Sequence, residues 1–215
     1  MTLVNVNYWE AKEILARNGV EVSKGKLVNS EEEAVKVARK IGYPVVMKIV
    51  SPDAIHKSDV GGVITHINCD EEVVLFFRDL MKVAKRKRIN LKGIAVEKME
   101  RGLETIVGVK TDDVFGKVVL FGLGGIFTEV IKDVSLRVLP ISKRDVMSMF
   151  HELKYGFLLD GFRNYPKADK GEIANFIMKV VKMVERENVY EMDLNPVMVW
   201  GNRVVAADVR MVLER

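Results

Sequence analysis

Apolar residues recur along the chain at two spacings, one typical of helices and the other typical of strands. The helical stripe of residues 34–41, for example, follows a capping box of Ser30 and Glu33 and ends at Gly42. The predicted helices cover residues 10–18, 30–41, 70–84, 142–153 and 169–187, and Asp70 is the expected cap of the third. The predicted strands cover residues 43–50, 60–67, 94–99, 105–109, 118–121, 190–200 and 203–213.

Helices and strands alternate at first and then give way to consecutive strands. This order predicts an α+β fold in which βα units are followed by hairpins. We expect two α/β lobes, residues 1–97 and residues 98–215, with the boundary between two strands at residues 97–102.

A lysine interrupts the apolar strand of residues 43–50. Burying the Lys48 ammonium is costly unless an anion meets it. The loop that follows holds cations, hydroxyl groups and glycine, which suit a bound polyphosphate. This loop includes His56, Lys57, Ser58, Gly61 and Gly62. The segment therefore predicts half of a nucleotide site. His56 either hydrogen-bonds a phosphate or accepts a phosphoryl group, since a neutral imidazole nitrogen is a nucleophile.

The last two strands predict a magnesium site. Gly201 and Asn202 fit a two-residue hairpin loop, so the numbers of facing residues add up to 403. Asn195 then faces Asp208, and Asp193 lies on the same face, two residues along the strand. An amide and a carboxylate oxygen suit Mg²⁺; alternatively, these side chains form a structural polar cluster. Pro196 lacks an N–H, so this strand is expected to be an edge strand or to be bulged.

Two carboxylates, Glu97 and Glu104, flank the predicted lobe boundary, where each either binds ribose hydroxyl groups or is solvated. Asp133 and Arg137 have the spacing of an ion pair on a helix. Arg163 lies in a polar loop, where it holds an anion or is a plain surface charge.

Composition excludes some classes of function. The 215 residues include 34 Lys and Arg and 30 Asp and Glu, for a net charge of +4. No basic and aromatic stripe accompanies this charge, which argues against a nucleic-acid partner. Cys69 is the lone cysteine, so no disulfide forms within the chain. We find no secretory leader or membrane-spanning run and expect a cytoplasmic location.

Several motifs together closely resemble the β subunit, the ATP-grasp chain, of ADP-forming acetyl-CoA synthetase, a relative of succinyl-CoA synthetase. These motifs are residues 42–48 (GYPVVMK), 51–53 (SPD), 56–59 (HKSD), 61–63 (GGV), 121–125 (FGLGG) and 191–196 (EMDLNP). The resemblance covers essentially the whole chain and implies an ATP-grasp fold, with ATP or ADP held between the two lobes.

The resemblance also implies roles for individual residues. Lys48 corresponds to the lysine on the nucleotide phosphates, and Asn195 and Asp208 to the Mg²⁺ ligands. Asp193 matches an acidic position that steadies phosphohistidine. The resemblance further implies that the phosphate-covering loop includes Lys57, Ser58, Gly61 and Gly62, that the adenine hinge is formed by Glu97, Lys98 and Met99, and that Glu104 is a ribose or nucleotide contact.

The mechanism implied by the resemblance is a phosphoryl relay. A histidine of the partner α subunit is phosphorylated by an acyl phosphate and then passes the phosphoryl group to ADP, with His56 as a second carrier. The α subunit carries the CoA-binding and phosphohistidine domains, so we expect a heterotetramer of two α and two β chains. Two alternatives remain: another ATP-grasp carboxylate ligase, and a non-catalytic nucleotide-sensing module.

Overall fold

The computed structural model describes residues 2–52, 61–125 and 132–215. The chain divides into two compact units, each treated by itself. Unit 1 comprises the residues up to Val6, residues 11–22 and residues 100–215, and unit 2 comprises residues 7–10 and 23–99. This division differs from the expected lobe of residues 1–97, because most of the N-terminal segment packs with the C-terminal strands.

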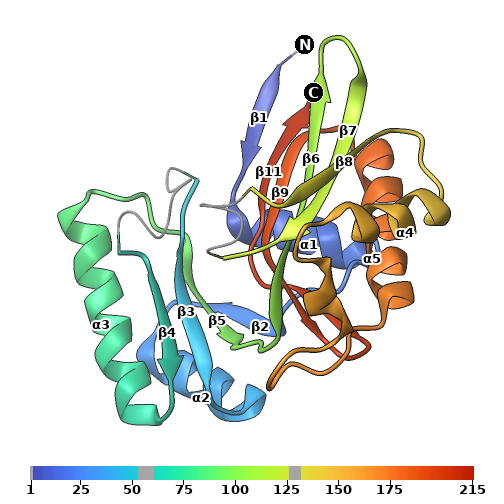
Figure 1. Ribbon diagram of the computed structural model, residues 1–215. Helices are drawn as coiled ribbons and strands as arrows, with labels where there is room; N and C mark the ends of the chain where they lie inside the picture. Colours follow the sequence, from blue (N-terminus) through green and yellow to red (C-terminus); the bar gives the residue numbers. More distant parts are fainter. Residues whose placement is uncertain (1, 53–60, 126–131) are drawn as a thin grey trace. The chain divides into compact units, whose positions relative to one another are not determined.

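Unit 2 is a four-stranded antiparallel sheet with two helices. Its elements are β2 (Gly25–Val28), α2 (Glu31–Ile41), β3 (Val45–Val50), β4 (Val63–Ile67), α3 (Asp70–Arg86) and β5 (Gly93–Lys98). The strand order is β2-β5-β3-β4 (Figure 1).

One face of the unit 2 sheet forms the core with α2 and α3. Val45, Met47 and Ile49 of β3 pack in this core with residues of both helices, including Ala38 and Phe77. Because side chains alternate along a strand, Val46 and Lys48 point to the opposite face. The helices therefore leave Lys48 on the face that they do not cover.

Unit 1 is built on a larger antiparallel sheet. Its strands are β1 (Leu3–Val6), β6 (Leu103–Asp112), β7 (Gly116–Leu123), β8 (Val134–Val138), β9 (Val189–Trp200), β10 (Arg203–Ala206) and β11 (Arg210–Glu214). Its helices are α4 (Lys143–Glu152), the 3₁₀ helix η2 (Gly156–Asp160) and α5 (Lys170–Arg186), while α1 (Tyr8–Arg17) contributes its first turn to unit 2. The strand order is β1-β11-β9-β6-β7-β8, and β10 also pairs with β9.

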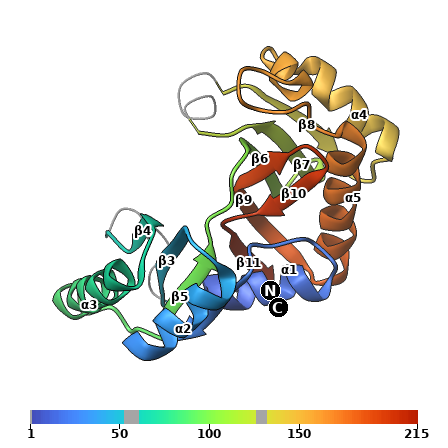
Figure 2. The ribbon, with the colours of Figure 1, turned by 90° about the horizontal axis from the view of Figure 1, so that it is seen from below.

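Helices α4 and α5 lie together on one side of this sheet (Figures 1 and 2). Phe121 of β7 meets Phe150 of α4 edge to face, with ring centroids 5.0 Å apart. Met192 and Leu194 of β9 are buried, whereas Asp193 between them is partly exposed. The alternation places Asp193 on the face opposite the helices, as it does Lys48 in unit 2.

The helix starts follow the expected capping chemistry with one exception. Ser142 and Asp145 form a capping box at α4, and the Asp169 carboxylate accepts two backbone N–H groups at α5. At α3 the cap residue is Cys69 rather than Asp70. Asp70 is the first residue of the helix, where its carboxylate binds Arg39 and Tyr43.

Candidate functional site

The Lys48 side chain of unit 2 is held in a buried polar cluster of Tyr8, Lys48 and Glu97, which we call the lysine cluster. The Lys48 ammonium lies 3.1 Å from Oε2 of Glu97, and the two side chains are 8% and 0% exposed. Tyr8 donates its hydroxyl to the same carboxylate oxygen at 2.6 Å and accepts a hydrogen bond from Lys48 at 3.0 Å. The Lys48 ammonium also lies 4.7 Å from the centroid of the Tyr8 ring.

The cluster brings together two predicted site residues and one residue that the sequence analysis missed. Glu97 lies on β5 next to β3, and the register pairs it with Val46, so its side chain shares a face with Lys48. Tyr8 comes from the start of α1, 40 residues before Lys48. A buried ammonium needs a compensating anion, and Glu97 supplies one within the protein.

The residues after Glu97 are the expected adenine hinge. The backbone N–H groups of Lys98 and Met99 donate to the carbonyls of Lys24 and Pro44, at 2.7 and 3.2 Å. The Lys98 ammonium donates to the carbonyl of Gly42 at 3.0 Å. These donors already serve protein acceptors, and the assignment of an adenine hinge to residues 97–99 stays a prediction.

Part of the expected phosphate loop lies outside the described residues, including His56, Lys57 and Ser58. Gly61 and Gly62, at the end of that loop, are described. Gly61 has a φ of +70°, a backbone conformation that favours glycine. The Gly62 carbonyl accepts the N–H of Ile49 at 2.8 Å, which attaches the end of the loop directly beside Lys48.

The hairpin register in unit 1 is the one that the sequence predicts. Trp200 pairs with Arg203, Val197 with Ala206, and Asp193 with Arg210. The N–H of Ala207 donates to the carbonyl of Pro196 at 2.9 Å, in the same register. Because the pairs on both sides of Asn195 and Asp208 keep this register, these two residues lie across from each other.

Pro196 lies at an irregularity of a central strand. Strand β9 pairs with β6 on one side and with β10 and β11 on the other, so it is not an edge strand. Along β6 the pairing passes from Thr105–Val197 to Val107–Leu194, which leaves one extra residue in β9. The sequence leaves two alternatives open for this strand, and the structure shows the bulge rather than the edge strand. The bulge accommodates the missing N–H of proline.

The charges around Asp193 come from the strands on either side of it. Asp193 faces Arg210 on β11 and Gly108 on β6. Burial raises the pKa of the Asp193 carboxyl above its usual range, and Asp208 and Glu191 raise it further, while Arg210 lowers it. Asp193 and Asp208 therefore lie close enough to interact electrostatically.

The donors at this hairpin fit a magnesium ion. Asn195 offers an amide oxygen and Asp208 a carboxylate, both hard ligands. Within the described ranges, no group of three or more His, Cys, Asp or Glu side chains is placed to bind a metal. Magnesium does not require such a group, since it keeps water and phosphate oxygens in its shell. The donor set suits a cation that is shared with a polyphosphate.

A cavity of about 320 Å³ in unit 1 lies beside Glu104. Its lining includes Gly124, Gly125 and Arg163. The N–H of Gly124 donates to the carbonyl of Glu104 at 2.7 Å, and a side chain at Gly125 would meet the Glu104 carboxylate. Arg163 has a φ of +52° and lies over the ring of Phe162. The structure thus brings Glu104, the glycines after β7 and Arg163 to one cavity.

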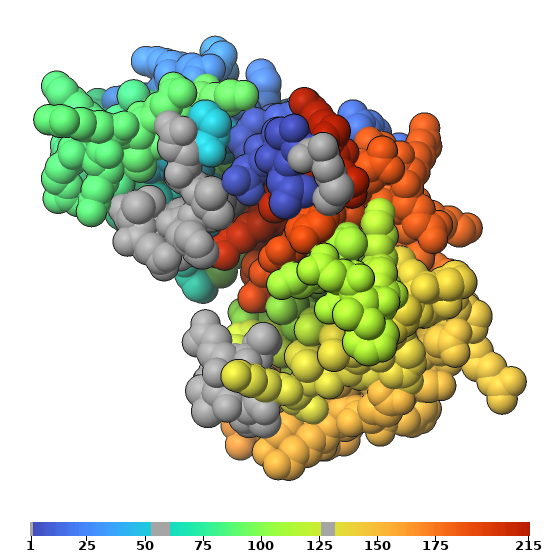
Figure 3. All heavy atoms as spheres, turned by 90° about the horizontal axis from the view of Figure 1, so that it is seen from above, coloured from blue at the N-terminus to red at the C-terminus, as the bar shows by residue number. Residues whose placement is uncertain are grey.

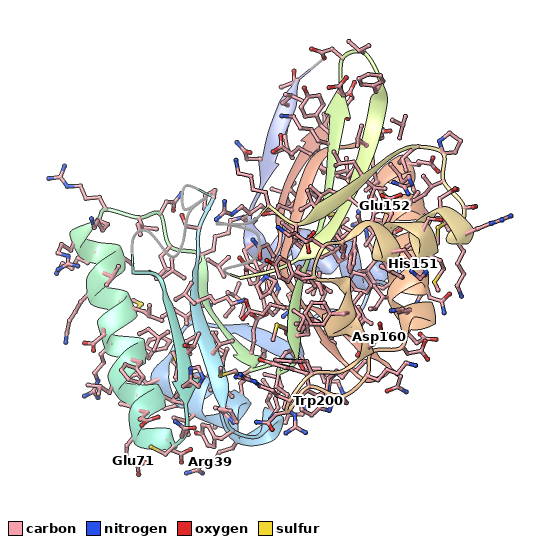
Figure 4. All side chains as sticks on the ribbon, viewed as in Figure 1. Arg39, Glu71, His151, Glu152, Asp160 and Trp200 are labelled. Atoms are coloured by element: carbon pink, nitrogen blue, oxygen red, sulfur yellow. The ribbon has the colours of Figure 1, made fainter. Side chains whose placement is uncertain are left out.

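Asp133 and Arg137 do not form the ion pair that their spacing suggests, because residues 134–138 are a strand rather than a helix. The Asp133 carboxylate accepts the N–H groups of Lys154 and Tyr155, both at 2.8 Å. Arg137 instead binds Glu152 of α4, labelled in Figure 4, through two hydrogen bonds. Both side chains therefore connect β8 and the residue before it with α4 and the residues that follow α4.

Comparison with known proteins identifies the class. The ATP-grasp domain family matches residues 4–213. The chain is 45% identical over 208 residues to the acetate–CoA ligase (ADP-forming) I subunit beta of Pyrococcus furiosus, an alignment that covers 95% of this chain and 90% of that subunit. It is 44% identical over 204 residues to the acetate–CoA ligase (ADP-forming) II of Archaeoglobus fulgidus, covering 95% of this chain but 30% of that ligase.

Solved structures agree with the sequence relatives. The dinucleotide-forming acetyl-coenzyme A synthetase 1 of Ca. Korarchaeum cryptofilum, in complex with coenzyme A, Ca-AMPCP and HgCl+, matches with a TM-score of 0.92 and 40% identity, covering 98% of this chain and 94% of that one. A second structure of that synthetase, with coenzyme A, Mg-AMPPCP and its phosphohistidine segment pointing towards the nucleotide binding site, has a TM-score of 0.83 and 39% identity. It covers 98% of this chain and 93% of that one.

The two α+β units and these matches define an ATP-grasp protein, as expected from the sequence. The chain belongs to the ATP-grasp domain family and, within it, to the group that includes the β subunits of ADP-forming acetate–CoA ligases. Across the described part of the chain, none of the helices has the length and apolarity needed to span a membrane.

Proposed function

We propose that the chain is the nucleotide-binding β subunit of an ADP-forming acyl-CoA synthetase. The complete enzyme converts acyl-CoA, phosphate and ADP into the free acid, CoA and ATP, and acetyl-CoA is the substrate that the relatives suggest. The single observation that supports the proposal most strongly is the hairpin register. It sets Asn195 across from Asp208 and close to Asp193 in a chain that is 45% identical to such a subunit.

The reaction proposed for this chain is phosphoryl transfer between a phosphohistidine and ADP. A β-phosphate oxygen of ADP attacks the phosphorus, the P–N bond breaks, and its electron pair returns to the imidazole nitrogen. Asn195 and Asp208 would hold Mg²⁺, which when bound offsets the charge of the phosphates. The solved complex of the Korarchaeum synthetase with Mg-AMPPCP supports this choice of metal.

Each remaining residue has a binding or orienting role in the proposal. Tyr8 and Glu97 hold the Lys48 ammonium in a fixed position, so it contacts the polyphosphate without a further loss of side-chain freedom. Asp193 accepts the N–H of the second ring nitrogen of the phosphohistidine and orients the ring. Glu104 binds the ribose, Lys57, Ser58, Gly61 and Gly62 cover the phosphates, and residues 97–99 contact the base.

The proposal requires a partner. We infer an α subunit that carries the CoA-binding and phosphohistidine domains, in a complex of two α and two β chains. The name of the Pyrococcus relative, a subunit beta, supports the partner, and the alignment with the Archaeoglobus ligase covers 30% of that ligase, which supports further domains beside this one. Because ADP and acyl-CoA are metabolites of the cytoplasm, we place the proposed complex there.

The test is to purify the chain with its native partner and to measure acyl-CoA-dependent ATP formation with several acyl groups. The Asp208→Ala complex should lose nearly all activity. The Glu185→Ala complex, changed at an exposed carboxylate of α5, should keep it. Full activity of the Asp208→Ala complex would refute the assignment of Asp208 as a metal ligand. A wild-type complex that forms no ATP from acyl-CoA would refute the proposed function.

We further propose that His56 carries the phosphoryl group covalently between the partner histidine and ADP. The measurement is acid-labile, base-stable phosphate on this chain after incubation of the complex with ATP. His56→Ala should abolish that label, whereas the exposed His66 of β4 should be replaceable by Ala without effect. An unlabelled chain together with an active His56→Ala complex would leave His56 as a phosphate contact only.

A further inference from the structure

One face of the unit 1 sheet carries apolar side chains that no described helix covers. The helical layer packs on the face of Val119 and Phe121 of β7, which are fully buried. The alternate residues of β7 and of its neighbour β8 point the other way. We call these residues, Val118 and Leu120 of β7 with Leu136 and Val138 of β8, the apolar face.

The apolar face is exposed and lies at the end of the sheet. Leu136 is 54% exposed and Val138 is 47% exposed. Strand β8 stands last in the strand order among the described residues. Edge strands usually carry charged residues that prevent association with other chains, and exposed apolar patches often mark interaction sites. This edge strand instead presents leucine and valine.

The apolar face continues to the predicted phosphoryl site. A single cavity of about 550 Å³ is lined by the apolar face and, at its far side, by Glu191 and Asp193 of β9. Asp193 lies on the same side of the sheet, since its neighbours Met192 and Leu194 are buried on the helical side. A molecule that fills the cavity would therefore touch both the apolar residues and Asp193.

We propose that this face receives the partner chain that brings the phosphohistidine. This inference rests on the proposed function, because the phosphohistidine must reach Asp193, which lies in the same cavity as Leu136 and Val138. The matched region is 30% of the Archaeoglobus ligase, so most of that enzyme lies outside the part that this chain resembles. The occupant is thus a large protein surface with apolar side chains at its centre.

The surroundings of the apolar face resemble the rim of an interface. Lys110 and Asp112 of β6 and Glu191 of β9 line the same cavity and are exposed. An apolar centre with a charged rim is the usual composition of a specific protein interface. At the tip of the β6–β7 hairpin, Phe115 is 66% exposed and also lines the cavity. This hairpin projects at the top of unit 1 in Figure 1 and is the yellow-green surface in Figure 3.

The experiment compares two leucines of equal exposure. Leu136 is 54% exposed on the apolar face, and Leu75 is 53% exposed on α3 of unit 2. Each is replaced by lysine in the full chain, and binding to the CoA-binding chain that co-purifies with the native protein is measured by titration. Leu136→Lys should weaken this binding by about 30-fold or more, as expected for a residue at an interface centre. Leu75→Lys should bind like the wild type.

One control and two contrary outcomes make the result decisive. Both variants should bind ADP and unfold like the wild type, which shows that Leu136→Lys acts at the surface. Equal partner affinity of Leu136→Lys and wild type, in a complex that does form ATP from acyl-CoA, would overturn the docking surface and leave the proposed function standing. A wild-type chain that dimerises by itself and becomes monomeric with Leu136→Lys would assign the face to a second copy and also overturn the proposal.

Discussion

The lysine cluster yields the most sharply defined prediction. Glu97→Gln keeps the shape of the side chain and one oxygen acceptor but removes the charge that lies 3.1 Å from the Lys48 ammonium. Glu97 is fully buried and Lys48 nearly so, so water does not replace the lost anion. The hydrogen bond from the ammonium to the Tyr8 hydroxyl remains.

The expected magnitude follows from this burial. Removing one partner of a buried ion pair typically costs about 3–5 kcal/mol, because the remaining charge is left uncompensated. For a chain of this size each kcal/mol lowers the melting temperature by about 2–4 °C. Glu97→Gln should therefore lower it by roughly 6–20 °C. Tyr8→Phe removes both hydrogen bonds of the hydroxyl, one to Glu97 and one from Lys48, and each bond to a charged group is worth about 1.5–3 kcal/mol.

Thermal unfolding followed by circular dichroism measures these losses. Glu31→Gln is the matched control, since Glu31 pairs with Arg78 at 2.8 Å on the surface of the same unit, and its melting temperature should stay nearly unchanged. The double variant Lys48→Met/Glu97→Leu removes both charges and should recover most of the loss. A single variant as stable as the wild type, or a double variant no better than the single, would refute this reasoning.

Three further predictions concern stability. Arg137 and Ser135 lower the pKa of the Glu152 carboxyl to about 2; Glu152→Gln should therefore lose stability above pH 4.5, and the deficit in urea unfolding should vanish as the pH falls towards 2. Burial raises the pKa of Asp193, so the free energy of unfolding of the wild type should fall as the pH rises from the usual carboxyl pKa to the raised one. Urea unfolding of Asp193→Asn over the same pH range should not show this loss. Gly102 has a φ of +149° and a methyl group there would meet the carbonyl of Val199, so Gly102→Ala should lower the free energy of unfolding, measured with urea, by more than about 1 kcal/mol.

The sequence predicts the hairpin and the main helices well, for local reasons. The loop length at Gly201 and Asn202 determines the register, and this register holds from Trp200 to Asp193 through the bulge at Pro196. The caps at Ser142 and Asp169 likewise depend on neighbours within three residues. Such features need no knowledge of distant contacts.

Contacts between distant residues could not be predicted in the same way. Strand β1 pairs with β11 across almost the whole length of the chain, and its four residues are too few to give a periodic signal in the sequence. Tyr8 hydrogen-bonds Glu97, which lies 89 positions away in the sequence. The sequence around Tyr8 would equally suit an aromatic residue of the core. The contacts of the Glu97 carboxylate with Lys48 and Tyr8 likewise join distant segments, and a contact of Glu97 with a nucleotide stays a prediction.

Trp200 also makes contacts, in unit 1, that could not be predicted from the sequence. It ends β9 and is labelled in Figure 4. The Arg101 guanidinium lies 4.6 Å from its ring centroid, and the Tyr165 ring lies 6.5 Å away. These three residues come from separate segments, so neither spacing nor composition indicates their contact.

The half-reaction of the proposed enzyme tests the central claim most directly. The complex is incubated with ATP labelled at the γ-phosphate, without acyl-CoA, and the acid-labile, base-stable label on the partner chain is measured. The wild-type complex and Glu185→Ala should form labelled phosphohistidine at the same rate, and Asp208→Ala should form almost none. Equal labelling with Asp208→Ala, or no label on the partner in the wild-type complex, would contradict phosphoryl transfer at this site.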